Sequence, residues 1–406
     1  SFINTTQHLK SSKNNYCINY NIYIKKLYNG IQNFSIGIMM KKLYIFLIIV
    51  VLVGICFFFF FKESKELIKI GFVGALTAKY SDLGNPMMNG ITVAFEEENY
   101  EINGKKIELI FKDDKKDEEV NRQIVNDFIN QGIKIVMGNV TSSMSKISMS
   151  IINKHKDMFM ISAASASNEF SGIDDQFFRV HVANNEQRFS SFTKYIKENK
   201  YKKIYGIYDP GNVTYTKDYL ENFEKSFISN GGENFIKYAK TDGNLEDLVL
   251  DINSLNPDLI LICANSVDAA RVVQYLKMKD IKTQIASSEW AMTPAFIENT
   301  GKYSEGIIFN IDYDENSKSE DFINFSNKFK KKYNIEPSLY ASKGYELARV
   351  VIELLKMGDQ TELKKNLLIK KEFKGLQDTI IFDKYGDVVR KFNTFKVING
   401  KFEKVE

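Results

Sequence analysis

From Leu67 onward the chain alternates short apolar, β-branched runs with longer segments of helical period. This alternation is typical of parallel strands covered by helices. One series extends from "LIKIGFVGAL" at 67–76 to "QFFRVHV" at 176–182, and the same order restarts with a helical segment at 185–199. Two successive series of similar size predict an α/β protein of two Rossmann-like lobes, with right-handed connections between parallel strands.

The individual elements follow from the same periods. Strands are expected at 67–76, 105–113, 133–138, 158–162, 176–182, 202–208, 234–239, 258–264 and 283–287. Helices are expected at 85–99, 118–131, 142–153, 185–199, 215–230, 245–255 and 266–279. The tail departs from the alternation, with three helical segments at 320–333, 340–357 and 361–368, and then strand-like segments at 378–387 and 391–405.

The N-terminal segment carries a membrane signal. Residues 43–61 form an uncharged run of nineteen residues, enough to span a hydrocarbon core of roughly 30 Å. Six lysines and no acids precede or begin this run, so the positive-inside rule places everything after Phe61 outside the cytoplasm. We expect 40–61 to be a signal or anchor, as an uncleaved helix, a cleaved signal peptide or a lipidated Cys56, and 1–39 to be a disordered or mis-called leader.

Charge and cysteine content narrow the function classes. Without the six leader lysines, 49 basic residues face 51 acidic ones, so nothing indicates nucleic-acid binding. Only Cys263 lies beyond the apolar run, so the exported part can form no internal disulfide. The three histidines match no metal-ligand spacing, and the chain has no phosphate-loop, dinucleotide or nucleophile-elbow motif. We therefore expect no catalytic residue, no metal and no cofactor.

Several polar segments follow predicted strand ends, where α/β proteins bind ligands. "GNVTSSMSKIS" at 138–148 opens a helix with clustered hydroxyl groups, which either cap the helix or help its free N–H groups to bind an anion. "ISAASASNEFSG" at 161–172 is a small-residue loop that a ligand could approach closely, or an ordinary loop. Glu289 stands beside Trp290, the only tryptophan, either as a surface pair or as part of a cleft.

Eight segments in order resemble the leucine/isoleucine/valine-binding protein family, the type I solute-binding receptors of ATP-driven uptake systems. They include "GALTAKYSDLGNPMMNGITVAFEEEN", "GNVTSS", "MISAASASNEFS", "FFRVHVANNEQ", "YDPGNVTYTKDY", "DLILICANSVDAARVVQYLK", "SSEWAMTPAFIENTGKYSEG" and "YNIEPSLYASKGYELARVVIELL". The resemblance extends from Ile68 to about Val397. It implies two lobes that close on a ligand about a three-strand hinge.

The resemblance also implies a set of ligand-binding residues. Ser142 matches the family serine that binds the ligand's α-carboxylate, Tyr215 matches a tyrosine that packs over the ligand, and Glu289 matches the acid that holds the α-ammonium group. Ala166 stands where amino-acid binders usually carry a threonine. The other expected contacts are Val140, Thr141, Ala164, Ser165, Ser167, Asn265, Trp290, Leu83 and Tyr340.

These matches predict the organisation and the partners. Lobe I is expected to comprise 67–182 and 313–373, and lobe II 183–312 and 374–406, with crossings near Val180–Ala183, Ile311–Asp314 and Phe373–Gly375. We expect a monomeric, extracytoplasmic receptor that delivers an amino acid, apolar or aromatic, to an ABC permease. Two alternatives stay open: another small polar solute, such as an amide or a carboxylic acid, and a sensor that signals through a partner.

Overall fold

The computed structural model describes residues 4–60 and 66–405, and the chain divides into two units, residues 1–65 and 66–406. The first unit holds one helix, α1 (Asn4–Phe60). Its segment Ile22–Val53 is long and apolar enough to cross a membrane. Phe61 and the side chain of Cys56 lie outside the described part of the chain, so the choice between anchor and lipid attachment stays a prediction.

The leader differs from expectation. Residues 4–39, predicted to be a disordered or mis-called leader, belong to the same helix as the apolar run. A helix satisfies its backbone hydrogen bonds within its own segment, so it needs no core to pack against. The leader also contains no proline, the residue that most strongly interrupts a helix. The helix was not predicted because a segment without a core-forming period was expected to be disordered.

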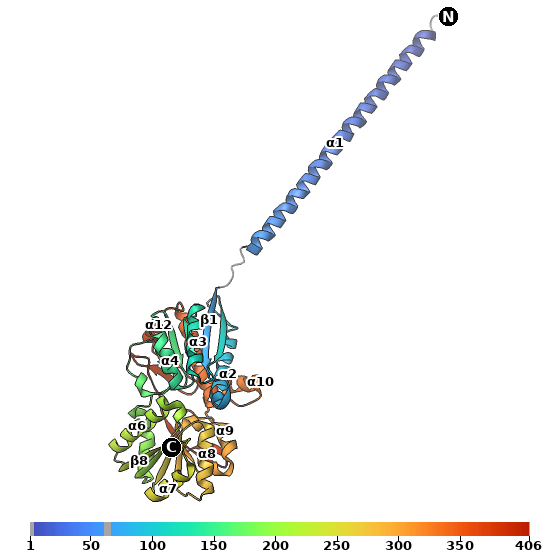
Figure 1. The fold of residues 1–406 in the computed structure, drawn as a ribbon. Helices are drawn as coiled ribbons and strands as arrows, with labels where there is room; N and C mark the ends of the chain where they lie inside the picture. Colours follow the sequence, from blue (N-terminus) through green and yellow to red (C-terminus); the bar gives the residue numbers. More distant parts are fainter. Residues whose placement is uncertain (1–3, 61–65, 406) are drawn as a thin grey trace. The chain divides into compact units, whose positions relative to one another are not determined.

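The second unit contains two large parallel sheets (Figure 1). The first sheet has the order β2-β3-β1-β4-β5-β6, and all its pairings are parallel except that of β2 with β3. Its strands are β1 (Leu67–Gly74), β2 (Glu101–Ile102), β3 (Lys105–Asp113), β4 (Ile135–Gly138), β5 (Phe159–Ser162) and β6 (Phe177–Arg179). The two-residue β2 is the only strand here that the sequence analysis did not predict.

Helices cover both faces of the first sheet, because successive side chains of a strand point to opposite faces. Val136 of β4 packs with α3 (Glu118–Asn130) and α4 (Ser142–Ile152), whereas its neighbours Ile135 and Met137 belong to the core shared with α2 (Ser81–Glu97) and α11 (Leu339–Met357). All three strand residues are buried. This burial on both faces explains why β4 reads as a continuous apolar run.

Glycines allow α2 and α11 to pack closely. A Cβ atom added to Gly90 of α2 would lie 1.9 Å from the carbonyl oxygen of Ala341. A Cβ added to Gly344 of α11 would lie 2.3 Å from the carbonyl oxygen of Met87. The two backbones are therefore closer than any other residue type permits. This contact attaches α11 to α2, and so places α11 against the first sheet.

The second sheet has the order β16-β15-β11-β10-β9-β7-β8. The β11–β15 and β15–β16 pairings are antiparallel, and all its other pairings are parallel. Its strands are β7 (Lys203–Tyr208), β8 (Asn234–Lys240), β9 (Leu259–Cys263), β10 (Gln284–Ser288), β11 (Ile308–Ile311), β15 (Asn393–Ile398) and β16 (Lys401–Lys404). The accompanying helices are α5 (Glu186–Glu198), α6 (Val213–Ser229), α7 (Leu245–Leu255), α8 (Ser266–Met278) and α9 (Pro294–Thr300).

The C-terminal part returns to the second sheet later than predicted. After α10 (Glu320–Tyr333), α11 and α12 (Leu363–Lys370), the chain forms a separate sheet of β12 (Glu372–Lys374), β13 (Thr379–Phe382) and β14 (Val388–Val389). The predicted crossing near Phe373–Gly375 was therefore wrong, because pairing with the second sheet begins only at β15. We propose a lobe boundary between β14 and β15 instead of at residues 373 and 374.

Contacts of this small sheet favour the same boundary. Asp387, just before β14, forms an ion pair at 2.5 Å with the buried guanidinium of Arg179 in β6. Lys364 of α12 pairs with Asp174 at 2.7 Å. Both partners lie at the edge of the first sheet, so residues 363–389 pack against lobe I.

Candidate functional site

Loops at the carboxyl ends of the two parallel sheets form hydrogen bonds with each other. The amide N–H and the hydroxyl of Ser143, at the start of α4, donate to Oδ1 of Asn212 at 3.1 and 3.0 Å. The amide N–H of Asn168, which follows β5, donates to Oδ2 of Asp218 at 2.9 Å. Because Asn212 and Asp218 follow β7 of the second sheet, these bonds join the two lobes.

A small cavity lies at this junction. It is lined by Val140, Ala164, His181, Asn212, Tyr215, Glu289, Trp290 and Tyr340. Six of these side chains belong to the thirteen that the sequence predicted as ligand contacts, whereas His181 and Asn212 do not. The cavity volume is about 10 Å³, room for a single water molecule. A larger solute therefore requires the lobes or the lining side chains to move apart.

Glu289 is the one acid of this cavity. It is the first residue after β10 and is buried, with 2% of its surface exposed. Its Oε1 atom accepts a hydrogen bond from the Tyr215 hydroxyl at 2.9 Å and lies 3.4 Å from Nε2 of His181. The same oxygen forms an ion pair with the guanidinium of Arg188. Its Oε2 atom is also buried but has no hydrogen-bond partner within the described residues.

The ion pair corrects our sequence interpretation of Glu289. We expected an acid whose countercharge would be a ligand ammonium, but Arg188 of α5 supplies that charge from within the protein. Burial by itself raises the pKa of Glu289, but the Arg188 charge and the contact with His181 outweigh burial and lower this pKa to about 2. The carboxylate is therefore ionised at neutral pH without a ligand.

Arg188 is placed by local structure that the sequence analysis did not connect to the site. Asn185 caps α5 by accepting a hydrogen bond from the Arg188 amide N–H at 3.1 Å. The guanidinium donates to the carbonyl oxygen of Val182 at 3.0 Å, and its central carbon lies 5.0 Å from the Phe392 ring and 5.5 Å from the Tyr219 ring. The side chain is 1% exposed and does not line the cavity. It therefore supports Glu289 from behind.

His181 lines the cavity but was not among the ligand contacts predicted from the sequence. We interpreted it as a satisfied structural histidine, yet its Nδ1 atom is buried and has no partner in the described part of the chain. Burial lowers the pKa of His181 despite its contact with Glu289, so the ring is neutral at pH 7. The contact between Nε2 and Glu289 places the ring proton on Nε2, which leaves Nδ1 as an acceptor.

Aromatic rings form the apolar part of the site. The Trp290 ring stacks on Tyr80 with centroids 5.7 Å apart and an interplanar angle of 8°. Tyr215 meets the same indole edge-on at 5.6 Å. Burial and the charge of Glu289 raise the pKa of both Tyr215 and Tyr340, so both hydroxyls keep their protons. Trp290 therefore stands in an aromatic cluster that includes Tyr80, a residue we did not predict.

The hydroxyl-rich start of α4 lies beside this cavity. Oγ of Ser142 accepts hydrogen bonds from the amides of Ala166 and Ser167 at 3.2 and 3.3 Å. Oγ1 of Thr141 is buried without a partner among the described residues. Ser165 shares a 2.5 Å hydrogen bond with Ser145. These side chains thus join the two small-residue loops to each other, and only Val140 and Ala164 reach the cavity wall.

Two further predicted residues lie away from the cavity wall. Asn265 caps α8 and donates to Asp209 and Asp268 at 2.8 and 2.6 Å, so its side chain is occupied. Leu83 is buried in the core of lobe I. Neither Asn265 nor Leu83 lines the cavity.

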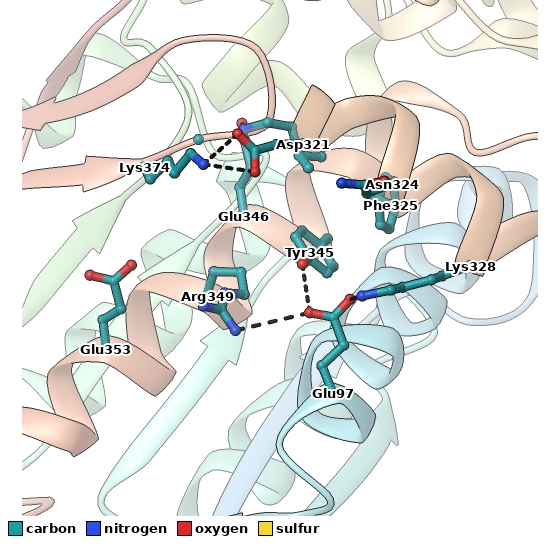
Figure 2. Close-up of a pocket in the computed structure, with 12 residues that line it drawn as sticks. Glu97, Asp321, Asn324, Phe325, Lys328, Tyr345, Glu346, Arg349, Glu353 and Lys374 are labelled. Atoms are coloured by element: carbon teal, nitrogen blue, oxygen red, sulfur yellow. Dashed lines mark hydrogen bonds and ion pairs between the residues drawn. The ribbon is translucent and has the colours of Figure 1, made fainter. Parts of the chain in front are cut away.

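A larger cavity, about 300 Å³, lies entirely in lobe I between α2, α10, α11 and β12 (Figure 2). Its acids already have partners: Glu97 contacts Lys328 and the Tyr345 hydroxyl, each at 2.8 Å, and Asp321 contacts Lys374 at 2.7 Å. A solute bound here would have to displace these ion pairs. The smaller cavity at the lobe junction, with unpartnered buried atoms, is therefore the better candidate.

Residues 67–401 match the profile of the periplasmic binding proteins. The chain belongs to this family. The chain is 22% identical over 355 residues to Leu/Ile/Val-binding protein homolog 3 of Brucella melitensis, which covers 84% of this chain and 94% of the relative. It is also 22% identical over 252 residues to the Leu/Ile/Val-binding protein of Escherichia coli K12, covering 60% of this chain and 67% of the relative.

Solved structures confirm the two-lobed fold of this periplasmic binding protein. A leucine-binding protein of Thermotoga maritima has a TM-score of 0.77 at 21% identity, covering 84% of this chain and 98% of the other. A solute-binding protein of R. palustris, solved with benzoate, has a TM-score of 0.76 at 16% identity, covering 84% and 95%. The family and the relatives that match this chain are binding proteins, so this protein is a solute-binding protein and not an enzyme.

Proposed function

We propose that this protein is the extracytoplasmic substrate-binding component of an ABC uptake system, and that it binds an amino-acid-sized solute in the cavity between its lobes. The observation that carries the proposal is that Glu289, which lines that cavity, has a buried Oε2 atom without a hydrogen-bond partner among the described residues. Leaving a buried acceptor unpaired is costly, and a ligand with an N–H or O–H group would remove that cost.

The remaining wall indicates what the other parts of the solute are. Trp290, Tyr215 and Tyr340 offer aromatic surface for an apolar or aromatic side chain. The start of α4 lies beside the cavity on lobe I, across from Trp290 and Tyr215 of lobe II, and its helix dipole and the hydroxyls of Thr141 and Ser142 favour a carboxylate or carbonyl oxygen once the lobes move apart. An amino acid has all three groups, and the Leu/Ile/Val-binding relatives support this choice.

A second class of solute is favoured by one observation. The ion pair between Arg188 and Glu289 removes the need for a charged amine on the ligand. An amide or a carboxylic acid with an uncharged donor would also complete the site, and one structural neighbour was solved with benzoate. We propose hinged opening and closure for either class, because the lobes meet through hydrogen bonds that can separate.

A thermal-shift screen of the full chain in detergent tests this function. The screen uses amino acids, small amides and aromatic acids, because a ligand at a hundred times its Kd adds about 2.7 kcal/mol to the unfolding free energy. At least one probe should raise the Tm, and Trp290→Ala should abolish that shift. A hit whose affinity is unchanged in Trp290→Ala would place binding elsewhere and overturn the proposed site.

A further inference from the structure

The polar wall of the cavity contains a charge pair that is already balanced. Glu289 carries the negative charge of the cavity, and Arg188 faces the same carboxylate oxygen from the protein interior. The other lining residues are apolar, amide or aromatic, apart from His181, which is neutral at pH 7. The site is therefore close to electrically neutral before any solute enters.

Two residues that line this neutral site each carry a buried acceptor atom without a hydrogen-bond partner among the described residues. Oε1 of Glu289 is occupied by Tyr215, His181 and Arg188, whereas Oε2 has no partner within residues 66–405. Nδ1 of His181 is likewise buried and unpartnered there, and with the proton on Nε2 it accepts a hydrogen bond. Both residues line the cavity, so one solute group with two N–H bonds could supply a donor to each.

A carboxamide and an ammonium group both provide two N–H bonds, and electrostatics decides between them. Moving an ammonium from water into a buried site costs far more than moving an amide unless a free countercharge awaits it. The carboxylate charge here is already shared with Arg188, and the guanidinium repels a second cation. An uncharged amide satisfies the same two acceptors without that repulsion.

Building on the proposed function, we infer that Arg188 is a specificity-determining residue that makes the cavity prefer a solute with an uncharged N–H₂ end, such as a carboxamide, over the matching ammonium. Arg188 acts through Glu289 and does not line the cavity. Its aromatic neighbours Tyr219 and Phe392 and its bond to the Val182 carbonyl hold it in place, so it stays with Glu289 as a fixed part of the site.

The test compares two matched probe pairs by thermal shift and calorimetry on the full chain in detergent. The first pair is 3-methylbutanamide and 3-methylbutylammonium, which differ in the end group. The second is L-leucine and its 2-hydroxy acid, which differ in whether an ammonium or a hydroxyl is present. The wild type should bind the member of each pair that lacks the ammonium group at least about tenfold more tightly, a difference of about 1.4 kcal/mol.

Variants at position 188 separate charge from packing. Arg188→Met removes the countercharge and should reverse the order, so that the ammonium probe binds more tightly. Arg188→Lys keeps the charge and should keep the wild-type order. Since Arg188→Met leaves the buried charge of Glu289 without a countercharge, this variant could fail to fold. The double variant Arg188→Met with Glu289→Gln provides a neutral site that should still prefer the amide.

The outcomes distinguish the two proposals. A wild type that binds the ammonium probes as tightly as their partners without an ammonium group overturns the inference and leaves the proposed function intact. The same holds if Arg188→Met and Arg188→Lys show identical preferences. A wild type that none of the four probes and no compound of the wider screen stabilises overturns the proposed function, and the inference with it.

Discussion

At the scale of single residues, the site depends on a contact that no sequence pattern shows. Glu289, Trp290, Tyr215 and Tyr340 could be predicted because each lies in a segment with a recognisable resemblance. Arg188 could not, because it is far from Glu289 in the chain and resembles any polar residue in the first turn of a helix. A buried cation near a predicted cleft acid is found only when the fold brings the two together.

Removing the acid alone should expose the strength of this pair. Glu289→Gln leaves the Arg188 guanidinium buried without a countercharge, so the unfolding free energy should fall by about 3–5 kcal/mol. Urea denaturation followed by circular dichroism measures the change. The double variant Glu289→Gln with Arg188→Met should recover most of it, because no buried charge remains. Equal losses in the single and double variants would show that the ion pair contributes nothing beyond packing.

At the scale of elements, nearly all strands and helices lie where the sequence periods predict them, and α7 and α10 match residue for residue. The misses are short: β2, β12 and β14 have two or three residues, β11 has four and α9 has seven. Such elements span at most about two periods of their hydrophobic pattern, too few to be recognised from the sequence, so neighbours determine them. The leader helix was missed for a different reason, because it forms without a core.

The contact between α2 and α11 provides a prediction at this scale. Gly90→Ala would place a methyl group on the Ala341 carbonyl, so the helices must separate and the unfolding free energy should fall by about 2 kcal/mol or more. Thr92→Ala on the same helix is the control, and it should change the unfolding free energy by no more than about 0.5 kcal/mol. A Gly90→Ala protein as stable as wild type would contradict the close packing of these helices.

At the scale of the whole molecule, the two lobes follow from the repeated β/α series and the family resemblance, and the crossings near Val180–Ala183 and Ile311–Asp314 stay predictions. The third crossing could not be predicted, because β12–β14 form a small sheet of their own before the chain rejoins the second sheet. Its position matters for closure, since Arg390 lies in this crossing and forms an ion pair at 2.8 Å with Glu346 of α11. The crossing is thereby tied to lobe I.

Closure itself can be weakened without touching the cavity wall. The hydroxyl of Ser266 in lobe II donates to Asp82 in lobe I, and neither residue lines the cavity. Ser266→Ala leaves this half-buried acid without its donor in the closed form, so solute affinity should fall roughly tenfold. Calorimetry with the best ligand measures the affinity, and small-angle scattering measures the radius of gyration. Ser304→Ala, whose hydroxyl bonds within lobe II, should bind normally.

His181 lies in the first predicted crossing, and Arg188 lies in the first turn of α5, which follows this crossing. Under the proposed function, the stretch that bends as the lobes close therefore also carries the residues proposed to set ligand preference. A substitution at these residues that changes the ligand preference would at the same time change the equilibrium between the open and closed lobes and the rate of ligand release. Ligand preference and lobe movement would therefore change together, so a redesign of ligand preference should also measure the lobe movement.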